Sequence, residues 1–141
     1  MHLCADSRQV SPGDAFVAVP GEHHDGRDYI DKAIAQGAQL VLAEAPLVNT
    51  YTVPVVALPN LAANLGNVAS SFYGCPSAQL ALIGVTGTNG KTSVTQYLAA
   101  LMRILGHKAQ AIGTISGSLT TPAPCDLQRQ LANLVKSQHR L

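Results

Sequence analysis

The 141-residue chain contains 47% hydrophobic, 12% charged and 4% aromatic residues, which suits one globular domain or two small ones and excludes a disordered tail. Its formal net charge of +1 provides no broad basic surface for nucleic acid or an anionic membrane. The longest apolar runs are too short to span a membrane, and the first residues show no secretory signal, so we expect a cytosolic protein.

The cysteines and histidines do not form a recognisable metal or disulfide pattern. Cys4, Cys75 and Cys125 have no C-x-x-C spacing, which favours reduced thiols. The neighbouring His23 and His24 point in different directions and have no third ligand at helical spacing, which favours a loop pair over a metal site.

Turn residues divide the first half of the chain into alternating strands and helices, typical of an α/β fold. A proline within residues 53–57 favours an edge position for that strand, and Asn60 is the candidate N-cap of the helix after it. Glycines stand where two of the helices should end. The predicted elements are a strand at 16–19, a helix over 29–34 before Gly37, strands at 40–42 and 53–57, and a helix over 61–72 before Gly74.

A linker at 74–77 predicts two domains, 1–78 and 79–141. The second domain should contain too few elements to cover a parallel sheet, so we expect it to be truncated, marginally stable and to expose helix residues Val94, Leu98 and Leu101. Its predicted elements are a strand at 80–85, a helix from 94 to Gly106, a strand at 109–112, a loop over 113–124 and a helix from Asp126 with Leu127, Leu131, Leu134 and Val135 on one face.

A glycine-rich stretch separates the predicted strand at 80–85 from the next helix. Gly87 and Gly90 allow successive amides to face an anion, and the helix N-terminus adds positive potential. Lys91 would reach the outer phosphates, and the Thr92 hydroxyl would hold Mg²⁺. The pattern is a variant phosphate loop, because its first glycine is Gly84. We favour ATP binding over a turn without a ligand.

The chain after the glycine-rich stretch contains few of the other residues that catalysis needs. The metal of a phosphate loop normally takes a second carboxylate, and Asp126 is the only acidic residue after Lys91. We favour a helix-capping role for Asp126 over a metal role. The catalytic apparatus is therefore expected to be incomplete.

The phosphate loop resembles the ATP site of the Mur ligases and the folylpolyglutamate synthetases. Motifs in the first half resemble the N-terminal domain of the UDP-N-acetylmuramoyl-tripeptide synthetases within the Mur ligase family. Thr120-Thr121-Pro122 resembles the substrate loop of that family. The first-half motifs are Asp6-Ser7-Arg8, the stretch from Gly13 to Gly21, the stretch from Asp25 to Ile30, and the stretch from Ala33 to Ala38.

This resemblance implies an ATP- and Mg²⁺-dependent ligase of peptidoglycan precursor synthesis. Such an enzyme joins a diamino acid, meso-diaminopimelate in preference to lysine, to UDP-N-acetylmuramoyl-L-alanyl-D-glutamate. The D-glutamate side carboxylate takes the terminal phosphoryl group, and the amine attacks the resulting acyl phosphate. The sequence leaves the oligomeric state open.

The resemblance also assigns site residues, and Lys91 is the implied catalytic residue. Ser7 has the alternative of a simple turn hydroxyl, and Arg8 that of a solvated charge near the uridine. The implied ATP-binding residues are Gly87, Thr88, Asn89, Gly90, Lys91, Thr92 and Ser93, with Thr92 on the metal. The implied substrate-binding residues are Ala5, Ser7, Glu22, His23, His24, Thr120 and Thr121.

Three functional hypotheses follow. The first is an N-terminal fragment of such a ligase, inactive by itself because the second magnesium ligand, a carbamylated lysine and a C-terminal domain of the family would lie beyond Leu141. The second is a short module that binds the UDP-linked precursor or ATP without catalysis. The third, which we favour least, is an unrelated kinase-like protein with a phosphate loop.

Overall fold

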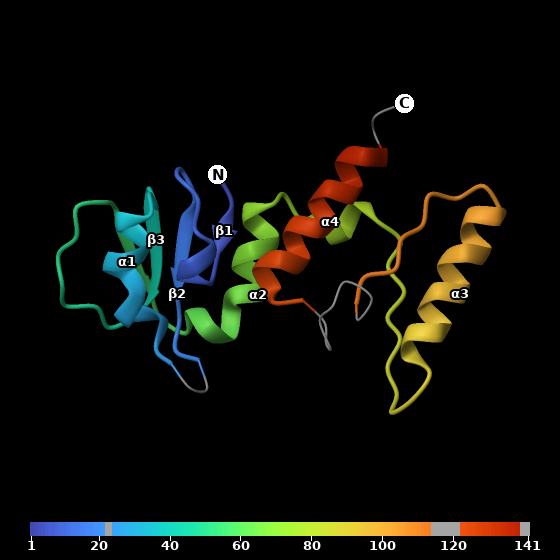
Figure 1. The fold of residues 1–141 in the computed structure, drawn as a ribbon, viewed down its shortest axis with the longest axis horizontal. Helices are drawn as coiled ribbons and strands as arrows, with labels where there is room; N and C mark the ends of the chain where they lie inside the picture. The colour runs from blue at the N-terminus through green and yellow to red at the C-terminus, as the bar shows by residue number, and fades with distance from the viewer. Residues whose placement is uncertain (22–23, 114–121, 139–141) are drawn as a thin grey trace.

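The computed structural model describes residues 1–21, 24–113 and 122–138. Its centre is a four-stranded parallel sheet in the order β1-β2-β3-β4, with helices on both faces (Figure 1). The α/β class predicted from the sequence is confirmed. The strands are β1 (Leu3–Cys4), β2 (Ala15–Ala18), β3 (Leu40–Glu44) and β4 (Val55–Leu58). The helices are α1 (Ile30–Ala35), α2 (Leu61–Phe72), α3 (Lys91–Ile104) and α4 (Pro124–Gln138), with short 3-10 helices η1 (Ser7–Gln9), η2 (Gly26–Tyr29) and η3 (Pro76–Gln79).

Strand β2 is buried along its whole length because both of its faces are covered. Phe16 and Ala18 face one cluster together with Ile30 of α1. Ala15 and Val17 face the opposite cluster together with Leu61 and Leu65 of α2. A strand buried on both faces has a continuous apolar sequence, which is why residues 15–18 lack the alternation of a half-exposed strand. Helices α1 and α2 therefore lie on opposite faces of the sheet.

The edges of the sheet are short strands. β4 lies at one edge, as the proline in its predicted segment led us to expect, and starts just after Pro54. β1 lies at the other edge and was not predicted, since two residues give no periodicity to recognise. Leu3 and Cys4 pair in parallel with Ala15 and Phe16.

Three helices end at the glycines that the sequence singled out. At the end of α1, Gly37 has a φ of +103°, its amide donates to the Ile34 carbonyl at 2.9 Å, and the amide of Ala38 donates to the Ala33 carbonyl at 3.0 Å. This is a Schellman motif, which uses a left-handed residue to satisfy the last carbonyls. The same pattern ends α2 at Gly74 and α3 at Gly106.

The N-terminus of α2 is capped from a distance. Asn60 occupies the N-cap position with a left-handed φ of +55°, but its side chain makes no capping hydrogen bond, so the predicted cap is wrong. Instead Glu44, at the end of β3, accepts the amide of Ala62 at 2.7 Å. A carboxylate there also complements the positive end of the helix dipole.

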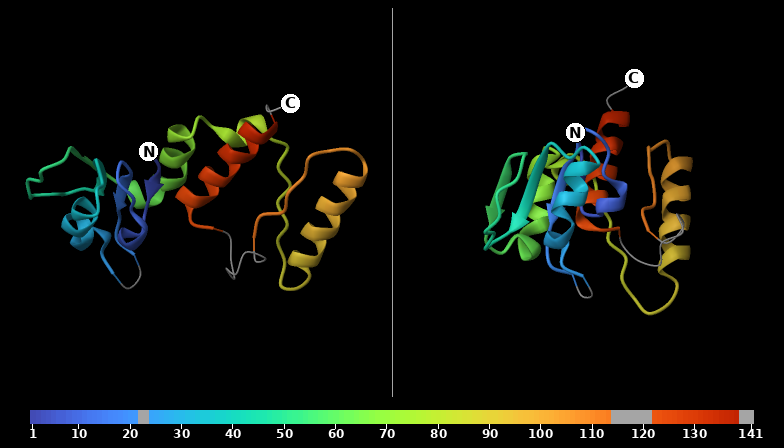
Figure 2. Two further views of the ribbon diagram at one scale, coloured as in Figure 1. Left: turned by 45° about the horizontal axis from the view of Figure 1, so that its top comes forward. Right: turned by 60° about the vertical axis from the view of Figure 1, so that its left-hand side comes forward.

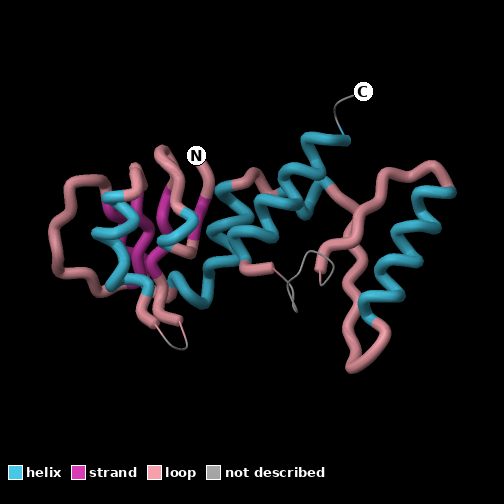
Figure 3. Tube along the Cα trace, viewed as in Figure 1, coloured by secondary structure: helices cyan, strands magenta, loops and turns pink. Residues whose placement is uncertain are grey.

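The second half departs from the sequence predictions. Residues 80–85 and 109–112 were predicted as strands, but neither segment is a strand in the structure. A strand needs a neighbour to accept and donate its ladder hydrogen bonds, and the described residues after 58 provide none. Figure 3 shows the segment before α3 as an extended loop.

Helix α3 begins at Lys91, three residues before the predicted start, and lies apart from the sheet in all views (Figures 1 and 2). Its apolar side is exposed, as predicted for Val94 and Leu101, which are 50% and 52% exposed. Leu98 is instead half-buried. No helix in the described part of the chain is long and apolar enough to cross a membrane.

Helix α4 packs against α2, η3 and β1 rather than against α3 (Figure 1). Cys125, which is 2% exposed, joins the cluster of Leu3 and Leu61. Of the predicted apolar face, Leu131 is buried, together with the neighbouring Ala132. The predicted cap Asp126 lies within the first turn of α4 and pairs with Arg129 one turn later, at 2.7 Å, so its carboxylate serves an ion pair.

Replacing Glu44 with Ala should lower the free energy of unfolding by about 0.5–2 kcal/mol, because the Ala62 amide loses its acceptor. Urea denaturation followed by circular dichroism measures the change. Glu44→Gln is the matched control, because it keeps an acceptor and should lose less. An unchanged midpoint for Glu44→Ala would show that the cap does not stabilise α2.

The three free cysteines should differ in thiol reactivity. Burial raises the pKa of Cys125 to about 11 and also raises the pKa of Cys4, whereas Cys75 is exposed. Iodoacetamide at pH 8, read by peptide mass spectrometry, should label Cys75 first and Cys125 last. Denaturation should abolish the difference, and equal rates in the native chain would contradict the packing of α4.

The same pKa shift has a consequence for stability. The folded state favours the neutral form of the Cys125 thiol. The resulting contribution to the free energy of unfolding is fully present below the ordinary pKa of 9.0, and it is lost as the pH rises toward 11. Cys125→Ser should therefore flatten the alkaline loss of stability over this interval.

Candidate substrate and nucleotide sites

Two of the predicted substrate motifs meet at one edge of the sheet. Ala5 and Ser7 come directly after β1, and His24 lies in the loop after β2. Because β1 and β2 are parallel neighbours, their carboxyl ends lie at the same edge. Open parallel sheets bind ligands at this edge. The fold thus brings these three residues toward one surface.

The loop after β2 is closed by backbone hydrogen bonds. The amide of Gly26 donates to Val19 and the amide of Gly21 donates to His24, both at 2.9 Å. A Cβ atom on Gly26 would lie 2.7 Å from the Val19 carbonyl oxygen, so only glycine fits there. This close approach fixes the base of the loop that carries His24.

Two Asp-x-Arg turns with the same local geometry flank this edge. Asp6 caps η1 and Asp25 caps η2, and each carboxylate accepts the backbone amide two residues later at 2.9 Å. Each also binds the side chain of that residue, Arg8 or Arg27, at 2.8 and 2.6 Å. Hydrogen bonds from these guanidinium groups hold the pKa of both carboxyl groups below the ordinary range.

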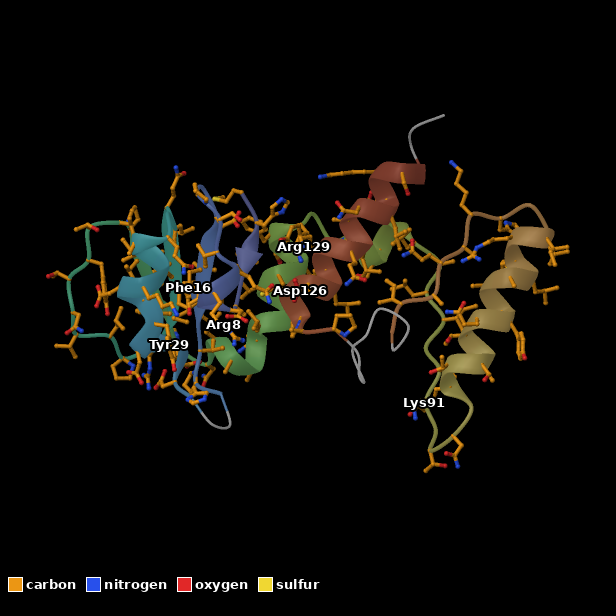
Figure 4. The ribbon with its side chains drawn as sticks, viewed as in Figure 1. Arg8, Phe16, Tyr29, Lys91, Asp126 and Arg129 are labelled. Atoms are coloured by element: carbon orange, nitrogen blue, oxygen red, sulfur yellow. The ribbon has the colours of Figure 1, made fainter. Side chains whose placement is uncertain are left out.

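Tyr29 follows the second Asp-x-Arg turn and contacts His24, and the sequence did not identify it as a site residue. It was assigned to the apolar side of a helix, but it precedes α1 and is 36% exposed. Its ring meets the His24 ring edge-on, with 6.4 Å between centroids. Figure 4 labels Tyr29 and Arg8 on the part of the chain that contains the sheet. An aromatic residue within the Asp25–Ile30 motif is the feature by which the sequence could have identified Tyr29 as a site residue.

Ser7 lies in η1 and is only 7% exposed. Its hydroxyl has no hydrogen-bond partner among the described residues. A hydroxyl without a protein partner can donate a hydrogen bond to a ligand and accept one from it.

A polar pocket of about 320 Å³ lies between the turn after β1 and the start of α4. Its three carboxylates are all paired: Asp6 with Arg8, Asp126 with Arg129, and Asp14 with the amides of His2 and Ser11. The pocket therefore offers hydrogen-bonding groups without three free negative charges. It is lined by Cys4, Ala5, Asp6, Gln9, Asp14, Ala123, Asp126 and Arg129.

The glycine-rich loop ends at the N-terminus of α3. Gly90 is the N-cap with a φ of +78°, and Gly87 has a φ of +150°. The ammonium group of Lys91 folds back onto the Gly87 carbonyl, while Thr88 and Asn89 are exposed. A 14-residue helix leaves its first four amides without helical acceptors, and these amides belong to the loop side of the helix.

The two candidate sites lie at opposite ends of the molecule. Lys91 is far from Arg8 and Tyr29 in Figure 4, which shows it at the N-terminal end of α3. Glu22, His23, Thr120 and Thr121 lie outside the described residues. Within the described ranges, no group of three His, Cys, Asp or Glu side chains is arranged to hold a metal ion.

Two family models match the chain. Residues 2–73 match the model for the Mur ligase family, catalytic domain, and residues 85–141 match the Mur ligase middle domain. The chain belongs to the Mur ligase family. Among Mur ligases, it is 46% identical over 98% of its length to the UDP-N-acetylmuramoyl-L-alanyl-D-glutamate--2,6-diaminopimelate ligase of Pseudomonas putida, and 51% identical over 80% of its length to that of Vibrio cholerae.

Solved Mur ligase structures share the fold. The MurF ligase of Thermotoga maritima in complex with ADP superimposes with a TM-score of 0.67 at 26% identity, over 90% of this chain and 28% of that one. MurF of Acinetobacter baumannii gives 0.63 at 28% identity, over 74% of this chain and 22% of that one. The chain spans about 30% of the Pseudomonas relative and 24% of the Vibrio one.

Replacing Arg8 with Met should raise the pKa of Asp6 toward its ordinary value, because the guanidinium donors are the largest cause of its depression. Carboxyl carbon NMR during an acid titration measures this pKa. Asp25, with its own arginine, should not change and is the internal control. The stabilisation from each pair is present above the ordinary aspartate pKa and is lost as the pH falls through the lowered value. An unmoved Asp6 pKa would contradict the pair.

Proposed function

We propose that this Mur ligase chain holds the UDP end of UDP-N-acetylmuramoyl-L-alanyl-D-glutamate at the carboxyl edge of its sheet and ATP at the loop before α3. The activity it would serve is the ATP-driven joining of this precursor to meso-diaminopimelate, since its relatives are named as diaminopimelate ligases. A cytoplasmic location fits such soluble substrates. The observation that carries the proposal is the meeting of Ala5, Ser7 and His24 at one sheet edge.

Several features of that edge support a nucleotide-sugar ligand. The Ser7 hydroxyl has no hydrogen-bond partner among the described residues, and Tyr29 offers a half-exposed aromatic surface to a base. Arg8 is held in a fixed orientation and is 78% exposed, so its remaining donors are open to a phosphate. The paired groups of the neighbouring pocket suit neutral sugar hydroxyls. Glu22, His23, Thr120 and Thr121 complete the proposed substrate contacts.

The loop before α3 fits a triphosphate. Gly87 and Gly90 take backbone angles open to glycine, and the loop is exposed on all sides. The amides of residues 87–93 would bind the phosphates, and Lys91 would leave the Gly87 carbonyl to neutralise the outer one. Thr88, Asn89 and Ser93 lie in this stretch, and the Thr92 hydroxyl would hold Mg²⁺. Bound ATP with Mg²⁺ supplies the phosphoryl group that activates the precursor carboxylate.

A second candidate function is binding without turnover by these residues. Residues 84–93 contain no Asp or Glu, and among the described residues no metal-binding group of three is present. Phosphoryl transfer depends on positioning and charge neutralisation, so a loop without a second acidic ligand should bind better than it catalyses. We therefore propose that the 141-residue chain binds both nucleotides and releases no ADP.

We also propose a domain boundary near residue 78. The two family models end at 73 and begin at 85, which leaves η3 and the extended segment after it between them. The packing of α4 on α2 and β1 means that this boundary in sequence is crossed by contacts in space.

Ser7→Ala should weaken binding of UDP, the probe of the first site, about 2- to 10-fold, as expected for one hydrogen bond. Lys91→Met should weaken binding of Mg·ATP about 10- to 100-fold, because a charged donor is lost. Isothermal titration calorimetry of the 141-residue chain measures both. Each variant is the control for the other ligand, which it should bind normally.

The outcomes separate the hypotheses. If the unaltered chain does not bind UDP at a millimolar concentration of UDP, the proposed substrate site is refuted. Joint loss of both ligands in one variant would indicate unfolding, which circular dichroism detects. ADP release that depends on diaminopimelate would sink the proposal of binding without turnover.

A further inference from the structure

The strand that leads to Ala5 and Ser7 is the shortest in the sheet and has one open edge. β1 contains only Leu3 and Cys4, and it pairs with β2 on one side. The Ala15 amide donates to the His2 carbonyl at 2.8 Å, so His2 faces β2. Residues alternate direction along a strand, so the backbone of Leu3 faces the free edge. A two-residue edge strand gains too few ladder bonds to hold itself in place.

Two side chains take the place of the missing ladder bonds. The Tyr73 hydroxyl accepts the Leu3 amide at 3.0 Å, across 70 residues of sequence. On the other side, the Asp14 carboxylate accepts the His2 amide at 2.9 Å. The two consecutive amides before the substrate turn are therefore fixed from opposite directions.

Tyr73 is itself held firmly. It is the C-cap of α2, packs against the cluster that contains Leu3 and Leu61, and meets the Phe72 ring edge-on at 5.0 Å. Its phenol is partly buried, and burial raises its pKa above the ordinary value. A rigid hydroxyl in an apolar setting fixes its partner more strictly than water would.

We propose that Tyr73 is a positioning residue for the UDP site: its hydroxyl holds β1 so that Ala5 and Ser7 meet the ligand. The inference rests on the proposed function of this edge. Only a short stretch of chain separates the amide that Tyr73 holds from the proposed binding residues, since Ala5 is two residues from Leu3. Tyr73 also directly precedes Gly74, so the same contact joins the turn to the segment that leads to η3.

The test compares Tyr73→Phe with Tyr51→Phe in the 141-residue chain. Tyr51 is also partly buried, and its phenol has no hydrogen-bond partner in the described part of the chain, so its variant controls for loss of a phenol. Titration calorimetry far below the melting temperature should show UDP binding weakened about 2- to 10-fold in Tyr73→Phe only. Mg·ATP binding should stay unchanged, and the Leu3 amide should exchange faster by NMR.

A merely structural role would lower the melting temperature without weakening UDP binding in the folded chain, and that result would overturn the proposal. If Tyr73→Phe does not fold, amide hydrogen exchange of the unaltered chain provides the test. Saturating UDP should slow exchange of the Leu3 amide but not of the α3 amides. Unchanged Leu3 exchange would overturn the proposal. Failure of the unaltered chain to bind UDP would instead refute the proposed function, and the positioning role with it.

Discussion

The parallel pairing of four short strands is the constraint on which the rest of this structure depends. Parallel strands need crossover connections, and α1 lies in the one between β2 and β3, where it covers one face of the sheet. Helix α2 follows β4 and covers the opposite face. The burial of β2 on both sides follows from this arrangement, as does its apolar sequence. The same pairing aligns the carboxyl ends of β1 and β2, so that motifs twenty residues apart share one edge.

The polar groups at that edge are organised by contacts within the protein itself. Asp6 and Asp25 each cap a 3-10 helix and hold an arginine two residues later, which fixes the direction of Arg8 and Arg27. Preorganised donors lose less conformational entropy on binding than free side chains do. The second half of the chain differs, because its glycine loop is exposed and the ammonium group of Lys91 donates to the Gly87 carbonyl of the loop itself.

The contrast between the two halves has a simple energetic origin. The first half buries apolar side chains on both faces of a sheet, whereas α3 leaves Ile104 and Leu105 82% and 62% exposed. Burial of each such side chain is worth about 1.5–3 kcal/mol. Helix α4 buries its apolar side chains by packing on α2, and Cys125 and Leu131 are both buried. Contacts in space thus cross the boundary proposed from the sequence.

The sequence by itself determined the elements whose signals are local. The apolar run of β2, the helix periodicity of 61–72 and the three terminating glycines were predictable, because each depends on neighbours in the chain. The glycine loop before α3 was equally visible, and the family resemblance assigned Ala5, Ser7 and His24. The expected strands at 80–85 and 109–112 were not formed, because strands depend on partners that periodicity does not reveal.

Only the tertiary structure decided the long-range contacts. No local pattern indicates that Glu44 caps α2 in place of Asn60, that Tyr73 holds Leu3, or that α4 covers β1. Each of these contacts joins segments between 18 and more than 100 residues apart, where the chain path and the packing of the whole core set the distance. The sequence therefore indicated candidate site residues, and the fold decided what holds them in place.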